Sequence, residues 1–306
     1  MVFIAVKRIY VAMALVPLLF TASPGARAWG PLGHHTVGAI ADAMLTDKAK
    51  QAVAALLTND LNAQGEPSGR TTLAQVASWP DEIRPTPANR PTWHFDDAPS
   101  CAAFPPAPTW CQNGECASSK IIEMVAIMKD SNADLRSRNE ALKWIVHLVG
   151  DVHQPLHAAE NYYEGTRKDS RGNTADRGGN DVEVALSGIK TSGAKDLHGV
   201  WDSEFVALAL GLPQSAKFPT PQIVAGLVGE ARQASTAGQP LDWVRESNQL
   251  ARSTAYNFPE FACYEPSTVT AVLNVAYIAH AKAVVHQKLV IAGARLANLL
   301  NAAFSQ

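Results

Sequence analysis

The feature that most restricts how this chain can fold is an apolar helical segment carrying ionisable side chains at metal-ligand spacing. His147 and Asp151 are four residues apart, so at 3.6 residues per turn they project from the same helix face. A carboxylate so near a buried face costs several kcal/mol unless it is paired or bound to a cation. The segment therefore predicts a buried metal site. Its neighbouring apolar face, expected to lie in the core, comprises Leu142, Ile145, Leu148, Val149 and Val152.

A second His/Asp pair and a displaced histidine extend this pattern. Pro155 is expected to end or kink the helix, so His157 should emerge at a new angle just beyond it. His198 and Asp202 are again four residues apart. Imidazole and carboxylate are ligands that zinc prefers, and a catalytic zinc site keeps one position open. The histidines interpreted instead as packing or solvent-exposed residues are His35, His153, His280 and His286.

The N-terminal residues are typical of a secretory signal peptide. The basic pair Lys7 and Arg8 precedes the apolar run 9–22, and an A-x-A cleavage site follows. The run of about 14 residues is short for a membrane anchor, which needs roughly 20. We therefore expect a signal peptide of residues 1–28 and a single domain of residues 29–306. The mature protein would be exported, to the periplasm or the extracellular space, with no membrane anchor.

The charge balance restricts the class of partner. Three positive charges would leave with the signal peptide, which moves the formal net charge from −2 to −5. This argues against a protein held on nucleic acid by a broad basic surface. A phosphate substrate remains possible, because bound metal ions supply positive charge locally. No protein partner is implied.

The four cysteines of an exported protein suggest two disulfides. Cys111 and Cys116 enclose a short loop that contains Asn113-Gly114, a pair that turns easily. Cys101 would then pair with Cys263 and tie a Pro-rich loop to the start of the last helical region. Zinc ligation by cysteine is the alternative, which the absence of a C-x-x-C motif disfavours.

Apolar residues recur at helical spacing along almost the whole mature chain. The one segment with strand-like alternation is 181–186, after Gly178-Gly179. The pattern predicts an all-α fold. The expected helices are 35–57, 72–83, 118–128, 139–154, 197–210, 221–234, 241–256 and 268–304.

Short motifs elsewhere carry further ligand-type side chains. They are Trp29-Gly-Pro-Leu-Gly-His34, Ser78-Trp-Pro-Asp81-Glu-Ile-Arg84, Trp93-His94-Phe95-Asp-Asp97 and Gly178-Gly-Asn180. With the two His/Asp pairs, these motifs resemble the zinc-dependent, single-strand-specific nuclease and 3′-nucleotidase family, also called class I nucleases. The resemblance spans Trp29 to the C-terminal helix. The lack of an Asn-X-Ser/Thr acceptor favours a bacterial-type member.

The resemblance implies a single helical domain of the phospholipase C / class I nuclease type with a trinuclear zinc cleft. Three Zn²⁺ would be bound, with one carboxylate shared between two of them. The implied ligands are Asp81, His94, His147 and Asp151 for one zinc; the Trp29 amine and carbonyl, His34 and Asp151 for its neighbour; and His157, His198 and Asp202 for the third.

The resemblance also implies roles for residues that contact substrate. Asp81, Arg84 and Asp151 would be catalytic, with Arg84 neutralising charge that develops on the phosphate. Phe95 would stack on a nucleobase and Asp97 would hydrogen-bond its edge. Asn180 would orient the substrate beside them. One departure is Pro80, which should kink the Asp81 helix or end it early.

The implied activity is hydrolysis of single-stranded DNA and RNA to 5′-phosphate products, and of 3′-nucleotides. Single-strand preference follows because a base can stack on an aromatic ring only when it is free of its complement. A secreted zinc-dependent phospholipase C is the alternative, which Asp202 in place of Glu disfavours. An exported zinc-storing protein is a third reading, but storage requires neither an arginine nor an aromatic rim.

Overall fold

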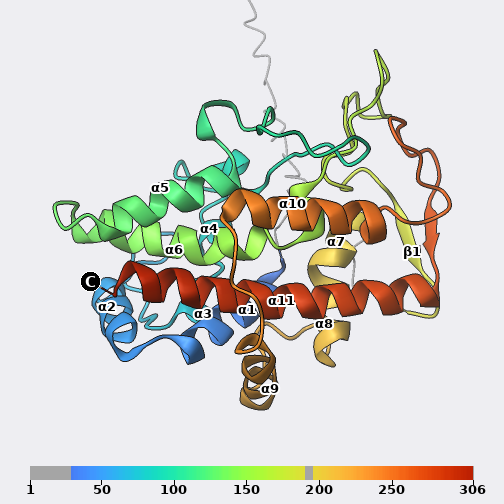
Figure 1. Cartoon of the computed structure of the whole chain (residues 1–306). Helices are drawn as coiled ribbons and strands as arrows, with labels where there is room; N and C mark the ends of the chain where they lie inside the picture. Colours follow the sequence, from blue (N-terminus) through green and yellow to red (C-terminus); the bar gives the residue numbers. More distant parts are fainter. Residues whose placement is uncertain (1–28, 190–195, 306) are drawn as a thin grey trace, which may run out of the picture.

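The computed structural model describes residues 29–189 and 196–305, so the expected signal peptide lies outside the described residues. The described chain is mostly helical, with one small sheet (Figure 1). The α-helices are α1 (Pro31–Met44), α2 (Asp47–Leu57), α3 (Leu73–Val76), α4 (Trp79–Glu82), α5 (Ala117–Lys129), α6 (Leu135–Asp151), α7 (Leu197–Gly199), α8 (Phe205–Leu210), α9 (Pro221–Ala231), α10 (Pro240–Leu250) and α11 (Val275–Ala303). Short 3₁₀ or π segments are η1 (Pro91–His94), η2 (Gln112–Gly114), η3 (Pro155–Ala158), η4 (Val200–Glu204) and η5 (Ala251–Ala255).

Helix α6 lies at the centre of the fold. It contacts α5, α11, α1 and α4, and each of its residues from Ala141 to Asp151 is buried. Its start is fixed by Asp134, whose side chain accepts a hydrogen bond from the Ser137 amide. The apolar face predicted from the sequence is buried as expected, but so are the other faces. Even Lys143 is fully buried, with its ammonium 2.8 Å from the Asp60 carboxylate.

Helix α11 crosses the width of the molecule and supports α1 (Figure 1). The two helices approach closely at Gly293, where an added Cβ would lie 2.5 Å from the Ile40 Cβ. Only glycine fits at this crossing. This contact fixes α1, and with it His34, against the rest of the core.

The sheet consists of two short parallel strands, β1 (Val184–Leu186) and β2 (Ala271–Leu273). β1 lies within the predicted strand 181–186 but is shorter. The prediction of one helix over 268–304 is wrong at its start, because β2 pairs with β1 and α11 begins only at Val275. Asn274 marks this boundary by accepting a hydrogen bond from the Tyr277 amide, 2.9 Å away.

Two other predicted helices are divided. The segment 35–57 forms α1 and α2, because Thr46 caps α2 and its own amide donates to Asn301 Oδ1 at 2.8 Å. The segment 72–83 forms α3 and α4, with Pro80 in the first turn of α4, where a proline is tolerated. Helix α6 ends at Asp151, before Pro155, which instead begins η3.

Both predicted disulfides are confirmed, Cys101–Cys263 and Cys111–Cys116. The first joins the loop after η1 to the segment before β2. Among the described residues there is no free cysteine, and no helix has the length and apolar character needed to cross a membrane.

We expect Cys101→Ser/Cys263→Ser to lower the free energy of unfolding by roughly 2–4 kcal/mol. The bridge spans 162 residues of sequence, so its loss frees a long loop in the unfolded chain. The matched variant Cys111→Ser/Cys116→Ser opens a separation of only 5 residues and should lose less. Urea denaturation of both variants measures the difference, and equal losses would contradict the loop-length argument.

Candidate metal centre

Five ligand-type side chains from four elements meet at the C-terminal end of α6. α1 supplies His34, α4 supplies Asp81, η1 supplies His94, and α6 supplies His147 and Asp151. These elements lie far apart in the sequence. The packing of α1, α4 and η1 around α6 therefore brings the side chains together.

The Asp151 carboxylate lies at the middle of this group. Its Oδ1 is 3.3 Å from His34 Nε2, and its Oδ2 is 3.3 Å from both His94 Nδ1 and His147 Nε2. The side chain is fully buried, and neither oxygen has a hydrogen-bond partner. Burial raises the pKa of Asp151 well above its ordinary value. Such a carboxylate calls for a cation.

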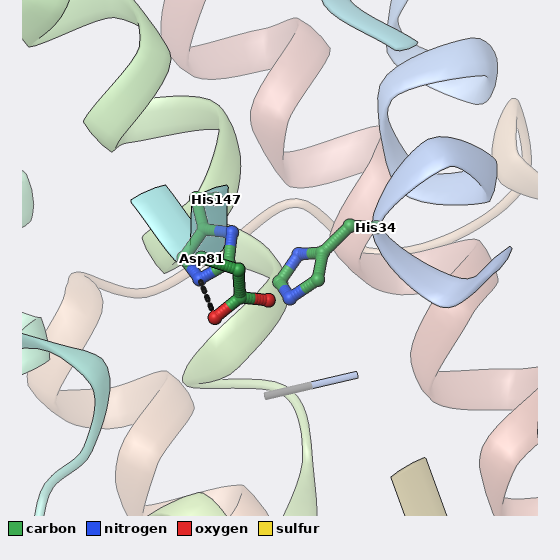
Figure 2. Close-up of side chains that lie close together, drawn as sticks. All are labelled: His34, Asp81 and His147. Carbon is green, nitrogen blue, oxygen red and sulfur yellow. Dashed lines mark ion pairs between the residues drawn. The ribbon is translucent and has the colours of Figure 1, made fainter. Parts of the chain in front are cut away.

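Asp81 belongs to the same group and lies beside His147 and His34 (Figure 2). Its Oδ1 is 3.9 Å from His147 Nε2, and the rings of His34 and His147 stack with centroids 3.8 Å apart. The Arg84 Nε donates to Asp81 Oδ1 at 2.7 Å. Asp81 and Arg84 are both partly exposed, so this edge of the group faces solvent.

A second group forms beyond the end of α6. η3 carries His157, α7 carries His198, and η4 carries Asp202. The Nε2 atoms of His157 and His198 are 2.9 Å apart, and His198 Nε2 is 3.2 Å from Asp202 Oδ2. All three are buried. Burial lowers the pKa of His198, but the nearby Asp202 carboxylate outweighs this and raises it to about 9.

Backbone carbonyls orient three of the imidazoles. The Nδ1 atoms of His147, His157 and His198 lie 2.6–2.7 Å from the carbonyl oxygens of Ala77, His94 and Gly178, respectively. This contact holds a proton on Nδ1 and leaves each Nε2 directed into its group. The same outer contact fixes the ligand tautomer in many metal sites.

The protonation states of four of these histidines also fit a metal. Burial lowers the pKa of His34, His94 and His157 well below the ordinary value, and that of His147 to about 4. These imidazoles are therefore neutral near pH 7, which is the form that binds metal. The buried polar atoms of the first group that lack a hydrogen-bond partner are His34 Nδ1 and Nε2, His94 Nε2, Asp81 Oδ2 and both Asp151 oxygens.

Trp29 lies between the two groups. Its indole Nε1 donates to the Gly150 carbonyl at 2.9 Å, and the Gly30 amide donates to the Asp202 carbonyl at 2.8 Å. Gly150 has no space for a side chain, because an added Cβ would lie 2.9 Å from His34 Nδ1. The start of the described chain is thus fixed to the end of α6 and to the middle of η4.

Comparison with known proteins identifies the family. Residues 29–305 match the S1/P1 nuclease family.

The chain belongs to the S1/P1 nuclease family. Members of this family are zinc-dependent hydrolases that act as endonucleases and 3′-nucleotidases, and their fold is helical and phospholipase C-like. Endonuclease 4 of Arabidopsis thaliana is 30% identical over 306 residues, which cover 92% of this chain and 91% of the relative. Nuclease S1 of Aspergillus oryzae is 28% identical over 297 residues, which cover 91% and 92%. The assignment to a bacterial type stays a prediction.

The remaining predicted site residues of this family member flank the second group. From His94 to Asp97 burial alternates, so the half-buried Phe95 and Asp97 share the face opposite His94 and Asp96. The Asp96 amide donates to the His157 carbonyl at 2.7 Å, which places this segment against η3. Asn180 is also half-buried and directly follows the glycines that contact His198.

The sequence interpretation missed two buried residues near the candidate metal ligands. Gln154 donates from Nε2 to Asp202 Oδ1 at 2.7 Å, although only its position between His153 and Pro155 could have signalled this. Glu160 accepts hydrogen bonds near Asp97, and no local pattern marks it. His153, by contrast, is turned away as expected, with Nδ1 against the Val149 carbonyl and Nε2 near Arg295.

We expect Asp151→Asn to lose two bound metal ions, because Asp151 borders every imidazole of the first group. Hydrolysis of single-stranded DNA should fall by more than the roughly 10–100-fold that loss of an outer-shell partner costs. Asp202→Asn should lose one ion. Elemental analysis and activity assays measure both.

His153→Gln is the control for these variants, since His153 is equally buried but points elsewhere. It should keep its full metal content. Metal loss equal to that of Asp151→Asn would contradict the grouping.

Proposed function

We propose that this protein is an exported, zinc-dependent phosphodiesterase that hydrolyses single-stranded DNA and RNA to 5′-phosphate products, and that also acts on 3′-nucleotides. The observation that carries the proposal is the Asp151 carboxylate, which is fully buried among three neutral imidazoles without a hydrogen-bond partner. Export is supported by the disulfides and by the signal-like residues 1–28.

Three zinc ions fit the residues present. His94, His147, Asp81 and Asp151 would hold the first zinc, and His34, Asp151 and the Trp29 amine and carbonyl the second. His157, His198 and Asp202 would hold the third. Bound zinc lowers the pKa of water toward about 7 and polarises phosphoryl oxygens. The candidate ligands form two separate groups, one around Asp151 and one around His198, and Trp29 lies between them.

Arg84 and Asp81 would act on the phosphate. Their mutual hydrogen bond holds the guanidinium at the partly exposed edge of the first group. There it can neutralise charge that develops on the phosphoryl oxygens. The buried Asp81 Oδ2 has no hydrogen-bond partner and is available to a metal ion or to the attacking water.

Phe95, Asp97 and Asn180 would bind the nucleoside part of the substrate. The shared orientation of Phe95 and Asp97 allows one residue to stack on a base while the other meets its edge. Stacking requires an unpaired base, which accounts for single-strand preference.

A phospholipase C is the main alternative, and a zinc-storing protein the second. We expect zinc-loaded mature protein to cleave single-stranded DNA and 3′-nucleotides while leaving phosphatidylcholine intact. Elemental analysis should give three zinc ions per chain, and a strong chelator should remove activity and lower the Tm, since zinc binds only the folded chain. Hydrolysis of phosphatidylcholine alone would contradict the nuclease proposal, and zinc binding without hydrolysis would favour storage.

The Trp29 amine tests the second zinc specifically. Trp29 is fully buried, so an added residue would displace its amine from the site. We expect protein exported and cleaved after Ala28 to be active, and protein made in the cytoplasm as Met-Trp29 to lose one zinc and nearly all turnover. The helical content measured by circular dichroism should be the same. Equal zinc content and equal specific activity in the two proteins would remove Trp29 from the site.

A further inference from the structure

Glu160 is a buried carboxyl group to which the proposed reaction gives no role. Only 5% of its surface is exposed. Its Oε1 accepts a hydrogen bond from the Arg177 amide at 2.8 Å, and its Oε2 accepts one from the Gly178 amide at 3.1 Å. The same carboxyl group is hydrogen-bonded to the Asp97 side chain. One side chain therefore joins two separate segments.

The first of these segments carries Phe95 and Asp97. The Glu160 amide donates to the Ala98 carbonyl at 2.8 Å, and the Ser100 amide donates to the Glu160 carbonyl at the same distance. The Tyr162 hydroxyl donates to the Asp97 carbonyl at 2.7 Å. The main chain around Glu160 thus lies beside residues 97–100, and the Glu160 carboxyl fixes the direction of the Asp97 side chain.

The second segment carries Asn180. Arg177 and Gly178 have φ values of 52° and 60°, a left-handed conformation that is unfavourable for arginine. The two hydrogen bonds to Glu160 stabilise this turn. The Arg177 carbonyl in turn accepts from Asn180 Nδ2 at 2.6 Å, so the Asn180 side chain depends on the position of Arg177.

The contact between Asp97 and Glu160 requires a shared proton, because two carboxylates cannot hydrogen-bond without one. Burial raises the pKa of both groups, to about 6 for Asp97 and well above the ordinary value for Glu160. Asp176 raises both further, and Asp96 also raises that of Asp97 while His198 lowers it. A proton held between the pair leaves Asp97 with an oxygen free to accept from a ligand.

We propose that Glu160 is a positioning residue that sets base specificity by aligning Asp97 and Asn180 toward the nucleobase. The inference rests on the proposed nuclease function. An accepting Asp97 oxygen favours bases whose pairing edge carries an amino group, which are adenine, cytosine and guanine. Uracil and thymine present one N–H flanked by two carbonyl oxygens. The accepting Asp97 oxygen repels these two carbonyl oxygens.

The test is the ratio of kcat/KM for 3′-GMP to that for 3′-UMP, measured on one enzyme preparation so that zinc loading cancels. We expect the wild-type ratio to exceed one. Glu160→Leu should lower it by roughly 2- to 10-fold, the range of one net hydrogen bond, mainly through KM for 3′-GMP. Glu160→Gln keeps one accepting oxygen and one donor group. Its kcat/KM ratio should therefore lie between those of the wild type and Glu160→Leu.

Two comparisons separate positioning from a general structural role. Glu164→Gln is the control for Glu160→Gln, because Glu164 is exposed, lies in the same loop and pairs with Arg167. It should leave the ratio unchanged. In an Asp97→Asn background, Glu160→Leu should change the ratio little further, because a residue that acts through Asp97 is not additive with it.

An unchanged ratio in Glu160→Leu would overturn the inference, as would additive effects in the double variant. So would an equal fall in cleavage of base-bearing and abasic single strands, which would indicate damage to the metal centre. Failure of the wild-type protein to cleave either strand would instead refute the proposed function itself.

Discussion

A fully buried carboxylate at the end of the central helix α6 is the constraint on which this structure depends. Asp151 lies among His34, His94 and His147 with no hydrogen bond to either oxygen, an arrangement that is unfavourable without a cation. The contrast with Lys143, eight residues earlier on the same helix, is informative. Lys143 is equally buried but has Asp60 as its partner. The fold therefore pairs the buried charge of Lys143 internally and leaves both Asp151 oxygens without a hydrogen-bond partner.

Contacts from the surrounding elements fix the histidines around this carboxylate and in the neighbouring group. The crossing of α1 and α11 at Gly293 fixes His34, and backbone carbonyls fix the tautomers of His147, His157 and His198. The contacts to these three imidazoles are made by main-chain carbonyls. One of them belongs to Gly178, which lies in a turn outside the helices, so the orientation of His198 also depends on the loop segment that Glu160 holds.

The sequence predicted the helical core of the fold well, and it failed where long-range contacts decide. Helical periodicity located α5 and α6 within a few residues. The segment before α11 was assigned to the helix because its apolar residues continue the pattern, yet Ala271–Leu273 pairs with β1 instead. The division at Thr46 was missed for a similar reason, since Asn301 stabilises that cap from the far end of the chain.

By itself the sequence determined which residues could act as ligands, which of them share a helix turn, and that Cys111 pairs with Cys116, because these properties depend on residue type and short spacing. The pairing of Cys101 with Cys263 followed because these were the two cysteines that remained. Only the tertiary structure decided that Asp81 and His34 meet His147, that His153 turns toward Arg295, and that Glu160 reaches both Asp97 and Arg177. Periodicity carries information over about one or two helical turns. Contacts between residues that are tens of positions apart arise only from how the helices pack, and the detailed geometry of the site is made of such contacts.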